Sequence, residues 1–159
     1  VRDGLKIYEN PFGVLTNNPP FEYHRMNMNN YMNLTAESPQ NRFADRLDLK
    51  PYAQGMGALG LPGDASSVSR FVRAVFLKWN SVAPEEEKAN VSQFFHILDS
   101  VAMVRGSVVT EQGTYDITTY SCCANTRTGV YYYKTYDDSR VRAVDMHETD
   151  LDGNVLIQR

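Results

Sequence analysis

Arg70 is the residue whose type and position in this sequence point most directly to chemistry. It follows a serine-rich stretch and lies near the start of an amphipathic helix that the apolar spacing predicts up to Trp79. A cation near a helix N-terminus adds to the attraction that free backbone amides exert on an anion or a thiolate. Most arginines are ordinary solvated residues, however. Because Arg70 lies away from the apolar stripe, periodicity alone leaves both interpretations open.

The other side chains with chemical potential do not form a recognisable site. His24 lies at the edge of an apolar stripe with no second ligand at a suitable spacing, so we expect a partly buried, hydrogen-bonded imidazole. His96 and Asp99 offer only two possible ligands. The sequence holds no Ser/His/Asp set, H-E-x-x-H motif or C-x-x-C pair. We therefore predict neither a metal site nor a cofactor.

Two further stretches resemble binding motifs but lack the flanking elements or the ligand residue that each motif requires. Gly55-x-Gly57-x-x-Gly60 has dinucleotide-binding spacing, yet prolines flank it where a strand and a helix are required, so we interpret it as flexible backbone. Residues 148–153 resemble the start of a calcium loop. The twelfth position is Arg159, where a bidentate Glu is needed, so a polar turn is the better interpretation.

Cys122 and Cys123 are the only cysteines. Adjacent residues of a strand point to opposite faces, so a disulfide between them would be strained. We expect two free thiols that pack within an apolar strand, in a reducing compartment.

The helix that carries Arg70 has a well-marked core face and start. Either Asp64 or Ser66 could cap its open amides, and Gly63 permits the preceding turn. Its apolar residues recur at helical spacing: Val68, Phe71, Val72, Val75, Phe76 and Trp79. This helix fixes the position of Arg70.

The remaining pattern predicts an α+β fold. We expect a hairpin over residues 5–17 that turns at 10–13 and leaves Asn17 at a strand end. A helix with Pro19 and Pro20 in its first turn should continue to about residue 34, and a long ordered loop should cover 36–54. A second amphipathic helix should start at the acidic run 85–87. Period-two patterns then predict an antiparallel meander of four strands, which cover 107–110, 115–123, 129–135 and 140–146. We expect Tyr131, Tyr132 and Tyr133 to point to alternating faces of the third strand. A further strand is expected at 155–158.

Composition agrees with one globular domain. The 159 residues are 42% hydrophobic and carry a net charge of −3. No basic block is present to bind nucleic acid, and no apolar run reaches the length of a membrane span. The chain starts without Met and stops inside a strand-like pattern, so we expect a piece of a longer polypeptide.

Several stretches resemble the bacterial choloylglycine hydrolases, which comprise the bile salt hydrolases and the penicillin V acylases. The resemblance runs in order along essentially the whole chain, and the Asn17-Asn18-Pro19 run and the tyrosine strand are more similar to the bile salt hydrolases. The stretches that carry it are 10–21, 60–64, 69–71, 91–98 and 130–133.

The resemblance implies an N-terminal-nucleophile hydrolase fold, in which two antiparallel sheets lie between helices as an αββα sandwich. Residues 1–159 would be the C-terminal half of one such domain, partnered by the N-terminal half of the same enzyme. It implies a cytoplasmic bacterial amidase, often a homotetramer, that cleaves glycine- or taurine-conjugated bile salts with an N-terminal cysteine. Val1 has no thiol or hydroxyl, so that nucleophile would lie outside this sequence. The alternatives are a penicillin V acylase or a non-catalytic α+β ligand-binding module.

Two positions match catalytic residues of the family. Asn17 matches the asparagine near the oxyanion and the amino group of the nucleophile, and Arg70 matches the arginine beside the thiol. The resemblance thus favours a functional role for Arg70 over an ordinary solvated one. Asn18 is the competing choice for the amide role.

Overall fold

The computed structural model describes residues 4–5, 7–148, 150 and 152–154. The chain divides into two compact units, residues 1–82 and residues 83–159. None of the helices in the described part of the chain combines the length and apolar character that a bilayer span requires. The predicted strand at 155–158 lies outside the described residues.

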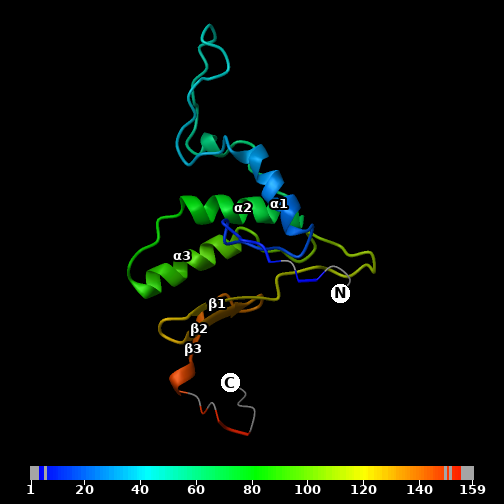
Figure 1. Cartoon of the computed structure of the whole chain (residues 1–159), viewed down its shortest axis with the longest axis vertical. Coiled ribbons are helices and arrows are strands. Elements are labelled where there is room, and N and C mark those ends of the chain that lie inside the picture. The colour runs from blue at the N-terminus through cyan, green and yellow to red at the C-terminus, as the bar shows by residue number, and fades with distance from the viewer. Residues whose placement is uncertain (1–3, 6, 149, 151, 155–159) are drawn as a thin grey trace. The chain divides into compact units, whose positions relative to one another are not determined.

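The first unit is built from helices and long connections. Helix α1 covers Phe21–Asn27 and continues as the 3-10 turn η1, Met28–Tyr31; a second 3-10 turn, η2, covers Met56–Ala58, and helix α2 covers Ser67–Asn80. The predicted first helix is confirmed, although it starts after Pro19 and Pro20 rather than with them and its 3-10 continuation ends at Tyr31. The predicted loop is also confirmed, and it extends away from the helices of its own unit (Figure 1).

Helix α2 provides the core of this unit. Phe71, Val72 and Val75 are buried, as the apolar spacing predicts, and the ring of Phe12 packs edge-on against Phe71 at 5.7 Å. Trp79 ends the stripe and is 62% exposed. The buried apolar side chains of the helix therefore lie within residues 71–75, directly after Arg70.

The predicted hairpin over residues 5–17 is wrong. Its turn forms, because the Gly13 amide donates to the Asn10 carbonyl at 3.3 Å and to Asn10 Oδ1 at 3.1 Å. The described residues on either side form no strand ladder. Leu5, Ile7 and Leu15 are between 73% and 87% exposed, so the alternating side chains bury no common face that would hold two strands together.

The glycine-rich stretch before α2 has a packing role. A Cβ atom on Gly57 would lie 2.0 Å from the carbonyl oxygen of Glu37, and the Thr35 amide donates to the Gly57 carbonyl at 3.0 Å. The chain thus packs against its own backbone at this position, where only glycine fits. Gly55 and Gly60 have φ angles of 79° and 98°, which glycine adopts without strain.

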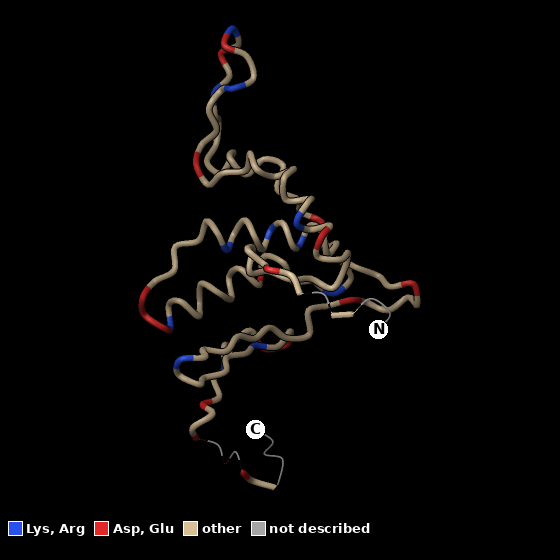
Figure 2. The backbone as a smooth tube through the Cα atoms, in the orientation of Figure 1, with Lys and Arg blue, Asp and Glu red and all other residues tan. Residues whose placement is uncertain are grey.

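The second unit starts with helix α3, Glu87–Asp99. The carboxylate of Glu86 caps it by accepting hydrogen bonds from the amides of Lys88 and Ala89, each at 3.1 Å. Figure 2 shows the acidic residues gathered at this helix start, where they complement the positive end of the helix dipole. The predicted helix is confirmed, and Phe95 is its buried residue.

Helix α3 packs against a three-stranded antiparallel sheet of order β1-β2-β3. The strands are Tyr120–Asn125, Val130–Thr135 and Arg142–Asp145, and the 3-10 turn η3, Met146–Glu148, follows. Three of the four predicted strands are confirmed, in shorter form. The strand predicted at 107–110 is wrong: it makes a single bridge, Val109 to Tyr115, and both residues are 60% exposed, so no buried face extends the pairing.

The tyrosines of β2 alternate as predicted. Tyr132 donates its hydroxyl to Glu87 Oε1 at 2.8 Å, whereas the rings of Tyr131 and Tyr133 share the opposite face at 6.3 Å. The prediction of two unbridged thiols is confirmed for Cys122 and Cys123. Burial raises the pKa of the Cys123 thiol, as expected for a packed cysteine.

Candidate active site

Arg70 and Asn17 lie in contact within the first unit. Arg70 is the fourth residue of α2, and its side chain leans toward the helix N-terminus. Its Nε donates to the Ala65 carbonyl at 3.1 Å, and its Nη2 donates to Asn17 Oδ1 at 3.4 Å. The structure therefore brings together the two residues that the sequence singled out, although 52 residues separate them along the chain. Their catalytic roles remain predictions.

The turn before α2 is held rigidly by its own hydrogen bonds. Ser66 is the N-cap, and its hydroxyl accepts from the Ser69 amide at 3.3 Å, which decides between the two predicted caps. Asp64 instead accepts from the Ser66 amide at 2.9 Å. Hydrogen bonds from Ser66 and Ser69 hold the pKa of the Asp64 carboxyl well below its usual value. Arg70 thus binds the carbonyl of a fixed turn.

Arg73 supports the same turn and was not singled out from the sequence. Its Nη1 donates to the carbonyl oxygens of Pro62 and Asp64, each at 2.8 Å. The sequence could have indicated this contact, because Arg73 is three residues after Arg70. Residues three apart share a helix face, and both long side chains lean toward the start of the helix. Two guanidinium groups therefore bind the carbonyls of Pro62, Asp64 and Ala65.

The segment that carries Asn17 is anchored through its neighbour. The carbonyl oxygen of Asn18 accepts hydrogen bonds from the Ser67 hydroxyl of α2 and from His24 Nε2 of α1, the latter at 3.2 Å. The Asn17 side chain is exposed, and within the described chain its Nδ2 makes no hydrogen bond. Because Oδ1 faces Arg70, Nδ2 is the end of the amide that is left to meet a ligand.

His24 meets the prediction of a buried, hydrogen-bonded imidazole, and it is fully buried rather than partly so. Its Nε2 lies 2.9 Å from Thr16 Oγ1. Its ring stacks on Phe71 with centroids 4.3 Å apart. The imidazole is therefore part of the core directly beneath the segment 16–18.

A carboxamide donor beside a fixed cation can stabilise negative charge that develops on a carbonyl oxygen. No cysteine occurs in the first unit, since the two cysteines of the chain are at 122 and 123. The arrangement of Asn17 and Arg70 is therefore suited to stabilising negative charge, and the first unit contains no thiol.

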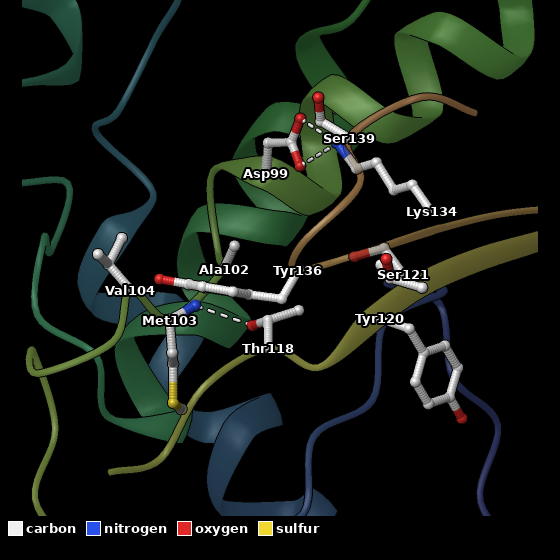
Figure 3. Close-up of a pocket in the computed structure, with 11 residues that line it drawn as sticks. Asp99, Ala102, Met103, Val104, Thr118, Tyr120, Ser121, Lys134, Tyr136 and Ser139 are labelled. Atoms are coloured by element: carbon white, nitrogen blue, oxygen red, sulfur yellow. Dashed lines mark hydrogen bonds and ion pairs between the residues drawn. The ribbon is translucent and has the colours of Figure 1, made fainter.

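The second unit has a cavity of about 290 Å³ between α3 and the sheet (Figure 3). On its rim, Lys134 Nζ binds both carboxylate oxygens of Asp99, at 2.6 and 2.7 Å, which ties β2 to α3. Below it the Thr118 hydroxyl accepts from the Met103 amide at 2.8 Å. These contacts join elements of one unit and involve neither predicted catalytic residue.

The family model described as linear amide C–N hydrolases, choloylglycine hydrolase family, matches residues 1–158. The chain belongs to the choloylglycine hydrolase family. The resemblance found in the sequence is thereby confirmed.

Two curated relatives that match the chain carry names that refer to bile salts. The chain is 52% identical over 157 residues to a bile salt hydrolase/transferase of Lactiplantibacillus plantarum, covering 99% of this chain and 48% of the relative. It is 40% identical over 156 residues to a bile salt hydrolase/transferase of Clostridium perfringens, covering 98% of this chain and 47% of the relative. The chain therefore spans about half the length of the curated relatives that it matches.

Solved structures confirm the predicted fold class. A mutant conjugated bile acid hydrolase from Clostridium perfringens superposes with a TM-score of 0.83 at 38% identity, over 97% of this chain and 47% of that chain. Penicillin V acylase from Agrobacterium tumefaciens gives a TM-score of 0.62 at 21% identity, over 88% and 38%. The chain has part of the N-terminal-nucleophile hydrolase fold of this choloylglycine hydrolase family.

Proposed function

We propose that this chain is the C-terminal half of a single-domain enzyme that hydrolyses the amide bond between a bile acid and glycine or taurine. The observation that carries the proposal is the hydrogen bond from Arg70 Nη2 to Asn17 Oδ1, which unites the two positions that match catalytic residues of the family. The names of the relatives that are 52% and 40% identical to this chain support the same substrate class.

In the proposed reaction, an N-terminal cysteine from the other half of the enzyme supplies the nucleophile. Its thiolate adds to the carbonyl carbon of the substrate amide, and its α-amino group serves as the base. The carbonyl oxygen then becomes an oxyanion. The C–N bond breaks as the amine leaves with a proton, and water hydrolyses the resulting thioester to the free bile acid.

Asn17 stabilises the oxyanion in this scheme. Its Nδ2 donates a hydrogen bond to the developing negative charge, an interaction that is worth about 3 to 4 kcal/mol in a known oxyanion hole. Donors count most when they are already oriented before the reaction. Arg70 provides that orientation, because its guanidinium holds Oδ1 and so directs Nδ2 outward.

Arg70 has a second proposed role beside the thiol. Nε and one N–H of Nη2 are engaged with Ala65 and Asn17, which fixes the plane of the guanidinium. A planar cation held in this way favours the thiolate over the thiol in its neighbourhood. The same group thus serves the nucleophile and the oxyanion donor.

The proposal extends to the assembly. The partner of this chain is the N-terminal half of the same domain, the complete enzyme is a cytoplasmic bacterial homotetramer, and it uses no cofactor. It acts on small conjugated bile salts and binds neither nucleic acid nor membrane. Size-exclusion chromatography with light scattering on the complete enzyme tests the subunit number: four copies support it, and a stable monomer overturns it.

The activity is tested on the complete enzyme, with taurocholate, glycocholate and penicillin V compared at equal concentration. We expect a higher kcat/KM for a conjugated bile salt than for penicillin V. A strong preference for penicillin V would assign the enzyme to the acylase branch. Absence of amide hydrolysis on all three substrates would favour a non-catalytic ligand-binding module instead.

A further inference from the structure

His24 contacts Thr16 and Asn18, the two neighbours of Asn17, and has no role in the reaction proposed above. Its side chain is completely buried, although Asn17, seven residues earlier, is exposed. The hydrogen-bond and ring contacts of His24 are with Thr16, Asn18, Tyr23 and Phe71, all of which belong to the first unit.

The hydrogen bonds of His24 determine where its ring carries the proton. Nε2 lies 3.2 Å from the Asn18 carbonyl oxygen, which can only accept, and 2.9 Å from Thr16 Oγ1. Nδ1 is buried without a hydrogen-bond partner. A buried N–H without an acceptor is costly, so the proton belongs on Nε2, where the Asn18 carbonyl receives it and Thr16 Oγ1 is a second acceptor.

We propose that His24 is a positioning residue for the oxyanion donor Asn17, an inference that rests on the proposed function of Asn17. The Nε2–H of His24 holds the carbonyl of Asn18 and so fixes the orientation of the Asn18 backbone. Thr16, on the other side of Asn17, contacts the same nitrogen. One imidazole therefore holds both neighbours of the residue that donates to the oxyanion.

The surroundings of the ring make this a rigid support. His24 stacks on Phe71 of α2 at 4.3 Å, with 21° between the ring planes, so it cannot swing away from the segment 16–18. Ser67 of the same helix donates to the same Asn18 carbonyl. The carbonyl is thus held from α1 and from α2 at once. A shift of about 1 Å in a positioning group can cost about 100-fold in rate.

The test uses two substitutions in the complete enzyme. His24→Phe keeps an aromatic ring that stacks on Phe71 but removes the donor, whereas His24→Gln keeps an N–H donor at nearly the position of Nε2. Val72→Ala is the matched control, because Val72 is equally buried in α2 but contacts neither Asn17 nor Asn18 by a hydrogen bond. Steady-state kinetics on taurocholate and thermal unfolding are measured for all variants, and the crystal structure of His24→Phe is solved.

We expect His24→Phe to lower kcat at least about 10-fold with KM within a factor of about two, since the donor is displaced but substrate contacts remain. His24→Gln should recover most of this loss. Val72→Ala should lower the melting temperature while the folded enzyme keeps its kcat. In the His24→Phe structure the Asn17 amide should be displaced from Arg70.

Equal kcat for His24→Phe and wild type would overturn the inference. So would equal losses in His24→Phe and His24→Gln, or losses in all three variants that follow their melting temperatures, since these indicate support of the core alone. The kinetics of the wild-type enzyme on taurocholate and penicillin V test the proposed function separately from the variants. If wild type prefers penicillin V, the same comparison of variants is made on that amide.

Discussion

Arg70 Nη2 donates a hydrogen bond to Asn17 Oδ1 at 3.4 Å, which joins the start of helix α2 to the segment that precedes α1. A primary amide has an acceptor at one end and donors at the other, so a donor such as a guanidinium can bind only the oxygen end. Binding of the acceptor end by a cation therefore fixes which end faces a substrate. The contact therefore directs the N–H end of the Asn17 amide away from Arg70.

Replacing Asn17 should abolish most activity without unfolding the enzyme. Asn17→Asp retains an oxygen that Arg70 can bind but has no N–H donor, so we expect kcat to fall by about 100- to 1,000-fold, as for loss of one oxyanion-hole donor. Asn18→Ala is the matched comparison, because its side chain makes no hydrogen bond within the described chain. A severe loss in Asn18→Ala with an active Asn17→Asp would assign the amide role to Asn18.

Arg70→Lys should lower turnover more than stability. The ammonium keeps the charge but cannot bind Ala65 and Asn17 from one rigid plane, so we expect kcat to fall by about 10-fold or more and the melting temperature to change little. Arg25→Lys, on the exposed surface of α1, is the control. Wild-type kinetics in a folded Arg70→Lys enzyme would remove Arg70 from the mechanism.

The contact between these residues was predictable only in part. Periodicity correctly placed Arg70 off the core stripe of α2 and Phe71 on it, because one helix fixes both directions. The pattern before α1 placed Asn17 at the end of a hairpin strand, and that strand did not form. Family resemblance linked the two positions. The Ser67 hydroxyl that holds the Asn18 carbonyl is a long-range contact that no local pattern encodes.

In the sheet, too, the sequence predicted features that depend on local spacing but not those that depend on long-range packing. The tyrosines of β2 alternate as the period of two predicts, because the pleat sets that pattern within one strand. The strand expected at 107–110 failed because pairing needs a buried face, and Val109 is 60% exposed. His24 was correctly predicted to be hydrogen-bonded, but its partners depend on how the segment 16–18 folds back onto α1 and α2.

Asp64 should make the turn before α2 sensitive to acid. Hydrogen bonds from Ser66 and Ser69 lower its pKa in the folded state from a usual value of 3.8. The stabilisation is therefore complete above about pH 4 and is lost as the pH falls toward the folded-state pKa. Urea unfolding of the complete enzyme between pH 6 and about pH 2.5 should show a smaller loss of stability in Asp64→Asn than in wild type. Parallel pH profiles would contradict this assignment.

The 159-residue chain should be inactive and prone to aggregation when expressed alone. Large apolar side chains are exposed in both units, including Phe43 at 83%, Trp79 at 62% and Tyr120 at 61%. The outer edges of β1 and β3 carry no further strand in the described chain, and unpaired edges promote association. Light scattering and thermal unfolding of the isolated chain measure this. A soluble monomer with a sharp melting transition would contradict the expectation and favour an independent module.

The most direct test of the account is a crystal structure of the complete enzyme bound to a mimic of the tetrahedral intermediate. We expect Asn17 Nδ2 to lie about 2.7 to 3.1 Å from the oxyanion, with Asn17 Oδ1 still hydrogen-bonded to Arg70. A structure in which the Asn17 amide is turned away from the oxyanion, or in which Arg70 no longer contacts it, would contradict the account.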